Sequence, residues 1–213
     1  MSVTNSRGYR NKSPMNIDYN PRNPWTGQVG LGDRWLPENQ RRFAEFETHE
    51  YGIRAGAVLL TTYFDRHGLK TVRGIINRWA PPVENNTSAY VTAVAKAVGV
   101  EPDDPINLHT YEHMRPLVEA IIRHELGGQP YAASVIDEGL RMAGIRKPVT
   151  TVAQAASTGT GRGAIEVGAV AAAATAAAPA IQAIGALPVW TGVALVLGAV
   201  AIAIFVVLKR RKD

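Results

Sequence analysis

The sequence of 213 residues contains no cysteine. This absence excludes a disulfide framework, a zinc ribbon and a thiol nucleophile. The patterns of a P-loop, of G-x-G-x-x-G and of G-x-S-x-G are also absent, so neither a nucleotide-binding loop nor a serine-hydrolase elbow is expected. The apolar fraction of 46% is ordinary for a globular protein and excludes wholesale disorder.

Charge is scarce in the last third of the chain. Residues 1–149 hold 18 of the 23 basic and 16 of the 18 acidic residues, whereas four of the remaining five basic residues are consecutive, at 209–212. The isoelectric point near 9.6 therefore owes much to this terminal cluster. Because no basic stripe with interleaved aromatic residues occurs elsewhere, no specific nucleic-acid site is expected.

Residues 189–208 form a stretch without a single charge, VWTGVALVLGAVAIAIFVVL. About 20 apolar residues suffice for a helix that spans a bilayer. Trp190 suits one interface and the basic cluster suits the other, cytoplasmic one, so we predict a single transmembrane helix within residues 188–213. A buried core helix is the alternative. The first twenty residues lack an apolar segment, so no conventional signal peptide is expected. The N-terminal domain would then cross the membrane either because the C-terminal helix acts late as its own insertion signal or because a virus particle carries the protein.

Between these parts, residues 147–187 are rich in Ala, Gly and Thr and predict a linker with a weakly apolar helical segment, broken by Pro179. Residues 1–146 predict one mainly α domain. Helical spacing of apolar residues, with capping residues at the ends, predicts its helices: 50–64, 71–79, 87–98, 117–126 and 131–143. Thr48 and Gly68 are the expected caps of the first of these helices. A small β element is expected near 25–35, with strand signals confined to residues before Phe46.

Glu125 is the first candidate catalytic residue. It continues the apolar face of its predicted helix, at i+7 from the first of three aliphatic residues: Val118, Ile121 and Ile122. Burial against aliphatic side chains raises the pKa of a carboxyl group, which suits a general acid for glycosidic cleavage. The alternative is a last-turn glutamate paired with Arg54 or Arg123.

Two further acidic residues are candidates. Glu50 precedes the apolar stripe of its own helix, although an acidic residue in a first turn also complements the helix dipole. Glu84 lies in the turn-rich segment PPVENNT, where it contacts either a ligand or solvent.

The segment His109-Thr110-Tyr111-Glu112-His113 matches the H-x-x-E-H pattern of one class of zinc peptidases. Two histidines at i and i+4 on a helix can bind one zinc ion. The segment lies between two prolines and lacks an evident third ligand, so we predict no metal and keep a zinc-dependent peptidase as an alternative. The tryptophans Trp25, Trp35 and Trp79 suit stacking on sugar rings or a place in the core.

Several longer motifs resemble those of phage virion-associated, lysozyme-like proteins that degrade peptidoglycan. These motifs are SRGYRNKSPMNI, WTGQ, RRFAEFETHEYGIRAGAVLLTTY, GLKTVRGIINRWAPPVENNTSAYVTAVAKAVGV and AIIRHELGGQPY, within residues 7–144. The chain departs from the family pattern at Ser13-Pro14-Met15, where the family has Asn-Pro-Gly. The resemblance implies a lysozyme-like helical domain and local degradation of peptidoglycan during genome entry or lysis.

In related transglycosylases the catalytic glutamate ends a helix before an asparagine-containing motif, whereas here the order is reversed. A circularly permuted lysozyme-like domain would reconcile the two orders and selects Glu125 over Glu50 as general acid/base. Glu50 or Glu84 would be the second carboxylate that a hydrolase needs. We expect substrate contacts from four more residues: Asn16, Trp79, Asn85 and Tyr131.

The resulting prediction is an enzyme that cleaves the bond between N-acetylmuramic acid and N-acetylglucosamine without a cofactor, as a lytic transglycosylase or as a muramidase-type hydrolase, with the transglycosylase preferred. Its expected partners are peptidoglycan, membrane lipid through the C-terminal helix, and other virion proteins. The expected location is the virion or the inner membrane of the host, with the domain facing the periplasm. A non-catalytic virion membrane protein that binds the cell wall or forms part of a DNA-entry conduit is the alternative.

Overall fold

The computed structural model describes residues 2–22, 24–81 and 87–148, which belong to a compact unit, Met1–Pro148. In these ranges no helix has the length and apolar character needed to cross a membrane. The predicted linker and transmembrane helix lie outside the described residues, as do Glu84 and Asn85. The predicted boundaries after residues 146 and 187 stay predictions.

The described part is mainly α, as the sequence predicts. Its helices are α1 (Arg7–Arg10), α2 (His49–His67), α3 (Val72–Trp79), α4 (Thr87–Val98), α5 (Tyr111–Leu126) and α6 (Ala133–Met142). There are also two short 3-10 helices: Val3–Asn5 precedes α1, and Glu38–Gln40 precedes the second strand.

Local capping explains where the helices begin and end. The Thr48 side chain accepts a hydrogen bond from the backbone N–H of Tyr51, and Gly68 ends α2 with a φ of 64°. Thr71 caps α3 in the same way through the N–H of Gly74. Side-chain acceptors at the first position satisfy N–H groups that otherwise lack partners, and glycine adopts the left-handed conformation without strain. The caps predicted for α2 are therefore confirmed.

Helix α5 differs from its prediction. Pro116 was expected to open the helix, but the N–H of Met114 already donates to the carbonyl of Thr110 at 3.0 Å, so the helix begins at Tyr111. Pro116 lies inside α5, where it cannot donate the bond that Glu112 would otherwise accept. Met114, in the first turn of α5, is fully buried, and burial of a large apolar side chain can offset a loss of this kind. Helix α6 likewise begins at Ala133, two residues later than predicted.

Two short strands form a β element, of which the first lies in the predicted region 25–35, whereas the second lies beyond it and reaches Phe46. β1 (Gln28–Leu31) pairs antiparallel with β2 (Ala44–Phe46), with an irregularity between Gln28 and Gly30. On the other side of β2, the N–H of Ala44 donates to the carbonyl of Ile17 at 2.8 Å. The N-terminal segment is thereby fixed along the hairpin.

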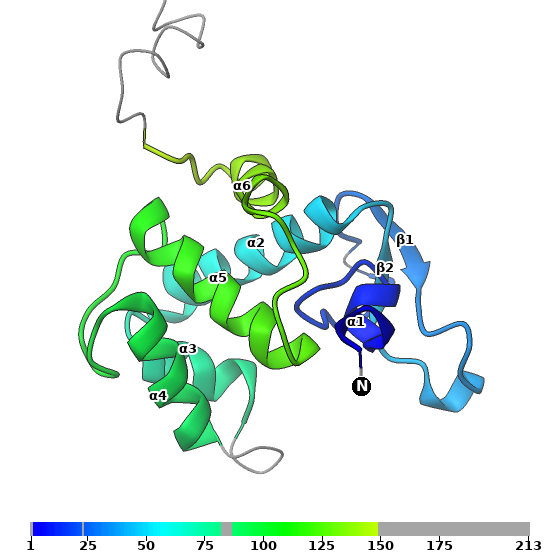
Figure 1. Cartoon of the computed structure of the whole chain (residues 1–213), viewed down its shortest axis with the longest axis horizontal. Coiled ribbons are helices and arrows are strands. Elements are labelled where there is room, and N and C mark those ends of the chain that lie inside the picture. The colour runs from blue at the N-terminus through cyan, green and yellow to red at the C-terminus, as the bar shows by residue number, and fades with distance from the viewer. Residues whose placement is uncertain (1, 23, 82–86, 149–213) are drawn as a thin grey trace, which may run out of the picture. The chain divides into compact units, whose positions relative to one another are not determined.

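Helix α5 occupies the middle of the domain, as Figure 1 shows, with α2 and α6 on one side and α3 and α4 on the other. Six of its side chains are buried: Met114, Leu117, Val118, Ile121, Ile122 and Leu126. Burial of each large aliphatic side chain is worth about 1.5–3 kcal/mol. The C-terminal end of α5 lies beside α1, so Glu125 lies near residues from the start of the chain.

Candidate functional site

A cleft of about 620 Å³ opens beside the end of α5. Its walls come from segments far apart in the sequence: the stretch after α1, the approach to β2, and helices α2, α3 and α5. The residues that line it are Met15, Asn16, Ile17, Asp18, Asn20, Trp25, Arg42, Phe43, Leu59, Tyr63, Trp79, Ala80, His124 and Glu125. Three of the predicted site residues are therefore in one cleft.

Glu125 is held from two sides. The Nδ2 of Asn16 donates to its Oε2 at 2.8 Å, and the indole Nε1 of Trp79 donates to its Oε1 at 3.2 Å. Both donors are N–H groups that cannot accept a proton. With no further donor to it among the described residues, each carboxylate oxygen keeps a second acceptor position for a ligand in the cleft. The alternative, in which Glu125 pairs with Arg54 or Arg123, is not found among the described residues, and Arg54 donates instead to the carbonyl of Met142.

Asn16 reaches Glu125 because the chain turns tightly after α1. The N–H of Asn16 donates to the carbonyl of Ser13, and the N–H of Ile17 donates to the Ser13 hydroxyl at 3.1 Å. Asn16 has a φ of 49°, in the left-handed region that residues other than glycine rarely adopt. Asparagine tolerates this region better than most residues, and strained conformations gather at functional sites.

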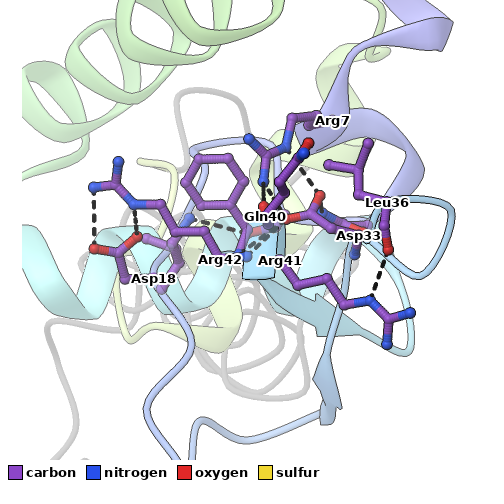
Figure 2. A network of polar contacts seen from close by, with 11 residues as sticks. Arg7, Asp18, Asp33, Leu36, Gln40, Arg41 and Arg42 are labelled. Carbon is purple, nitrogen blue, oxygen red and sulfur yellow. Dashed lines mark hydrogen bonds and ion pairs between the residues drawn. The ribbon is translucent and has the colours of Figure 1, made fainter. Parts of the chain in front are cut away.

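Asp33 is the centre of a polar network that supports this turn (Figure 2). Its buried carboxylate accepts hydrogen bonds from the Arg7 guanidinium, from Asn11 Nδ2 at 2.8 Å, and from the N–H groups of Arg42 and Phe43. Burial opposes ionisation, but these donors outweigh it and hold the pKa of Asp33 well below its usual range. The network joins the N-terminal segment to the loop before β2, so it shapes two walls of the cleft.

An ion pair lies on the rim of the cleft. Arg42 Nε donates to Asp18 Oδ1 at 2.7 Å, and the two residues lie at one end of the network in Figure 2. Both side chains are more than half exposed, so water screens the pair and its contribution to stability is small. Asp18 and Glu125 are the acidic residues among those that line the described cleft.

Aromatic side chains form much of the remaining wall. They are Trp25, Phe43, Tyr63 and Trp79, and the rings of Tyr63 and Trp79 meet edge to face at 6.4 Å. Trp35, also considered for sugar stacking, is not among the lining residues. Its ring is covered by the Arg10 guanidinium at 3.6 Å.

His124 also lines the cleft and stacks face to face on Tyr90, with ring centroids 3.5 Å apart. The Tyr90 hydroxyl is buried and has no hydrogen-bond partner among the described residues. Burial and the nearby charge of Glu125 raise the pKa of Tyr90, so its phenol stays protonated.

Glu50 and Tyr131 do not line this cleft. Glu50 lies in the first turn of α2, at the position that complements the helix dipole. The Tyr131 hydroxyl contacts His49 Nδ1 at 3.0 Å, and both rings pack with Tyr9. Burial lowers the pKa of His49, with the charge of Lys12 adding to this effect and that of Glu50 opposing it.

The H-x-x-E-H segment does not lie on one helix, because His109 precedes α5. His109 Nε2 contacts Asp65 Oδ1 at 2.8 Å, whereas His113 Nδ1 faces the Thr110 hydroxyl at 3.1 Å. Within the part of the chain that the structure describes, no group of three metal-binding side chains is close enough to hold an ion.

Sequence reasoning missed several residues of the site: Asp18, Asn20, Asp33, Arg42, Phe43, Tyr63 and His124. Most of them lie in loops without periodicity, so spacing gave no signal for them. Tyr63 could have been found, since it lies in the predicted helix 50–64.

The fold and the cleft define a mainly helical domain with a glutamate centred between an asparagine and a tryptophan. No protein-family model matches the sequence. Protein P5 of Pseudoalteromonas phage PM2 is 38% identical to the chain over 138 residues, which are 63% of this chain and 79% of that protein. The chain therefore belongs to the family of this phage protein.

Proposed function

We propose that this chain is a phage peptidoglycan-degrading enzyme that cleaves the glycosidic bond between N-acetylmuramic acid and N-acetylglucosamine as a lytic transglycosylase. The observation that carries the proposal is the placement of Glu125, whose carboxylate lies in the cleft between Asn16 and Trp79. The motifs that resemble lysozyme-like proteins supply several of these residues, in support of a lysozyme-like, circularly permuted domain.

The shape and lining of the cleft suit a sugar chain. Aromatic faces such as those of Trp25 and Trp79 pack against the apolar faces of pyranose rings, while Asn20 and Asp18 offer hydrogen bonds to hydroxyl groups. A cleft that takes a strand of sugars needs both kinds of contact along its length.

In the proposed reaction, Glu125 donates a proton to the glycosidic oxygen as the bond to C1 of the muramic acid breaks. The N-acetylglucosamine leaves with a free hydroxyl group. The Glu125 carboxylate then takes the proton of the muramoyl 6-hydroxyl, whose oxygen forms the new bond to C1 and closes an anhydro ring. The carboxyl group is thereby restored and no water is consumed.

Among the described residues of the cleft, the arrangement of carboxylates favours a transglycosylase over a hydrolase. A glycoside hydrolase generally uses two carboxyl groups flanking the scissile bond. Among the described residues that line the cleft, the second acid is Asp18, and Arg42 engages both of its oxygens. Glu50 lies outside the cleft, and Glu84 lies outside the described residues.

The relation to a phage protein supports a place in the virion and a role in genome entry or lysis. The uncharged stretch 189–208 supports anchoring of the domain to a membrane by one helix, with the domain facing the periplasm. Peptidoglycan, membrane lipid and other virion proteins are the partners that this arrangement implies.

The test compares the full chain in detergent with its Glu125→Gln variant on purified, dye-labelled peptidoglycan. We expect the variant to release dye at least about a hundredfold more slowly, because the amide cannot donate an acidic proton. Glu112→Gln is the matched control, since Glu112 is exposed on the same helix and outside the cleft; it should keep full activity.

Co-sedimentation with peptidoglycan separates catalysis from binding. Glu125→Gln should still sediment with the polymer, because the variant keeps the size of the side chain and one of its two acceptor oxygens. Equal rates for the wild type and Glu125→Gln would reject Glu125 as the acid. Binding by a wild type that releases no dye would favour the non-catalytic virion protein.

A further inference from the structure

Asn16 carries two unfavourable features at once. Its backbone has a φ of 49°, and its Oδ1 is buried without a hydrogen-bond partner among the described residues. The hydrogen bond that its side chain donates among the described residues goes to Glu125. A positive φ favours asparagine over most other residues, but it does not account for a buried Oδ1 without a partner or for an Nδ2 directed at Glu125.

Gly8 lies against the other side of the same amide. A Cβ built on Gly8 would lie 2.7 Å from Asn16 Oδ1, 2.7 Å from Leu126 Cδ2 and 2.8 Å from the carbonyl of Ser13. Gly8 is buried within helix α1. A glycine inside a helix is less stable than an alanine, and the lack of space for a Cβ explains why glycine occupies this position.

We propose that Gly8 and Asn16 form a positioning device for Glu125. Gly8 leaves room for the Asn16 amide to turn its Nδ2 toward the carboxylate, and Asn16 then fixes the orientation of that carboxylate in the cleft. Asn16 thus acts through Glu125 rather than as a substrate contact. This inference rests on the proposed function and adds two positioning residues to it.

The first test is Asn16→Gly, which removes the amide and lets the backbone keep its positive φ without strain. We expect the melting temperature to stay equal or rise, while kcat on peptidoglycan falls about a hundredfold and KM changes less than threefold. A rise in KM with unchanged kcat would overturn the inference, since that pattern belongs to a substrate contact.

The second test asks whether Gly8 acts through Asn16. Gly8→Ala should lower kcat about as much as Asn16→Gly does, and adding it to the Asn16→Gly variant should lower kcat less than twofold further. If the fold-decreases in kcat of the two single variants multiply in the double variant, Gly8 does not act through Asn16. A Gly8→Ala variant that fails to fold would overturn the role of Gly8 in the device, and the Asn16→Gly comparison would then decide the role of Asn16.

A readout without substrate keeps this inference separate from the proposed reaction. NMR of the Trp79 indole N–H, which donates to the other oxygen of Glu125, reports the orientation of the carboxylate in the wild type and in Asn16→Gly. The indole resonance should shift in the variant, because a carboxylate that has lost its Asn16 donor changes its geometry toward Trp79. An unmoved resonance overturns the device, whereas an inactive wild type with a moved resonance overturns only the reaction.

Discussion

At the scale of single residues, Asp33 shows how a buried charge can shape a site that it does not enter. Its carboxylate engages Arg7 and Asn11 on one side and two backbone N–H groups on the other. Asp33 also has a φ of 56°, so the chain accepts backbone strain to place it. The N-terminal segment and the loop before β2 are joined at this one side chain.

Replacing Asp33 with asparagine should therefore destabilise the domain by about 3 kcal/mol, because one partner of a buried charged cluster is removed. The free energy of unfolding in urea measures this change. Asp103→Asn is the control, since the Asp103–Arg73 pair is exposed and should leave that free energy nearly unchanged. Equal effects of the two substitutions would contradict the importance of the network.

The same residue predicts a dependence on pH. Because the pKa of Asp33 is held below its usual range, its ionised form stabilises the fold above about pH 4. That stabilisation is lost as the pH falls further, since the unfolded chain takes up a proton more readily than the folded one. The loss on acidification should be smaller in Asp33→Asn than in the wild type.

At the scale of elements, the first turn of α2 joins α1 to the loop between α5 and α6. His49 begins the helix, its ring packs against Tyr9, and its Nδ1 contacts the Tyr131 hydroxyl. Burial, together with the charge of Lys12, favours the neutral imidazole over the charged one, so the pKa of His49 is lowered.

When folding lowers the pKa of a histidine, the neutral side chain contributes stability at a pH above the pKa of the unfolded chain. This contribution to the free energy of unfolding is lost as the pH falls below about 6.5. The melting temperature of the wild type should therefore fall between pH 7 and pH 5 by more than that of His49→Gln. His67→Gln, at the exposed end of the same helix, should follow the wild type. An identical fall in all three proteins would show that His49 is not the titrating group.

Elements were predicted well where their signals are local. Thr48 and Gly68 cap the two ends of α2. The Thr48 side chain accepts a hydrogen bond from a backbone N–H of the first turn, and Gly68 adopts the left-handed conformation that ends the helix. The predicted start of α5 was wrong. The helix begins at Tyr111 and continues through Pro116, which usually lies in the first turn of a helix, and Met114 in the first turn of α5 is buried in the core. Tertiary packing of this kind cannot be predicted from the local sequence.

At the scale of the whole molecule, the site depends on contacts that span much of the chain. Asn16 and Glu125 are 109 positions apart, and Trp79 and Glu125 are 46 positions apart. Helical spacing and motif resemblance selected these three residues. The walls from the hairpin loop, including Arg42 and Phe43, were not selected, because only the folded chain brings a loop without periodicity to the end of α5.

Glu125 is proposed to catalyse an intramolecular transfer on peptidoglycan, and mass spectrometry of the fragments that the full chain releases from purified peptidoglycan tests this proposal. We expect fragments with 1,6-anhydromuramoyl ends, which are lighter by one water than the products of hydrolysis, and we expect these ends to be absent with Glu125→Gln. Fragments with reducing ends, or with cut peptide stems and intact sugar chains, would contradict this proposal.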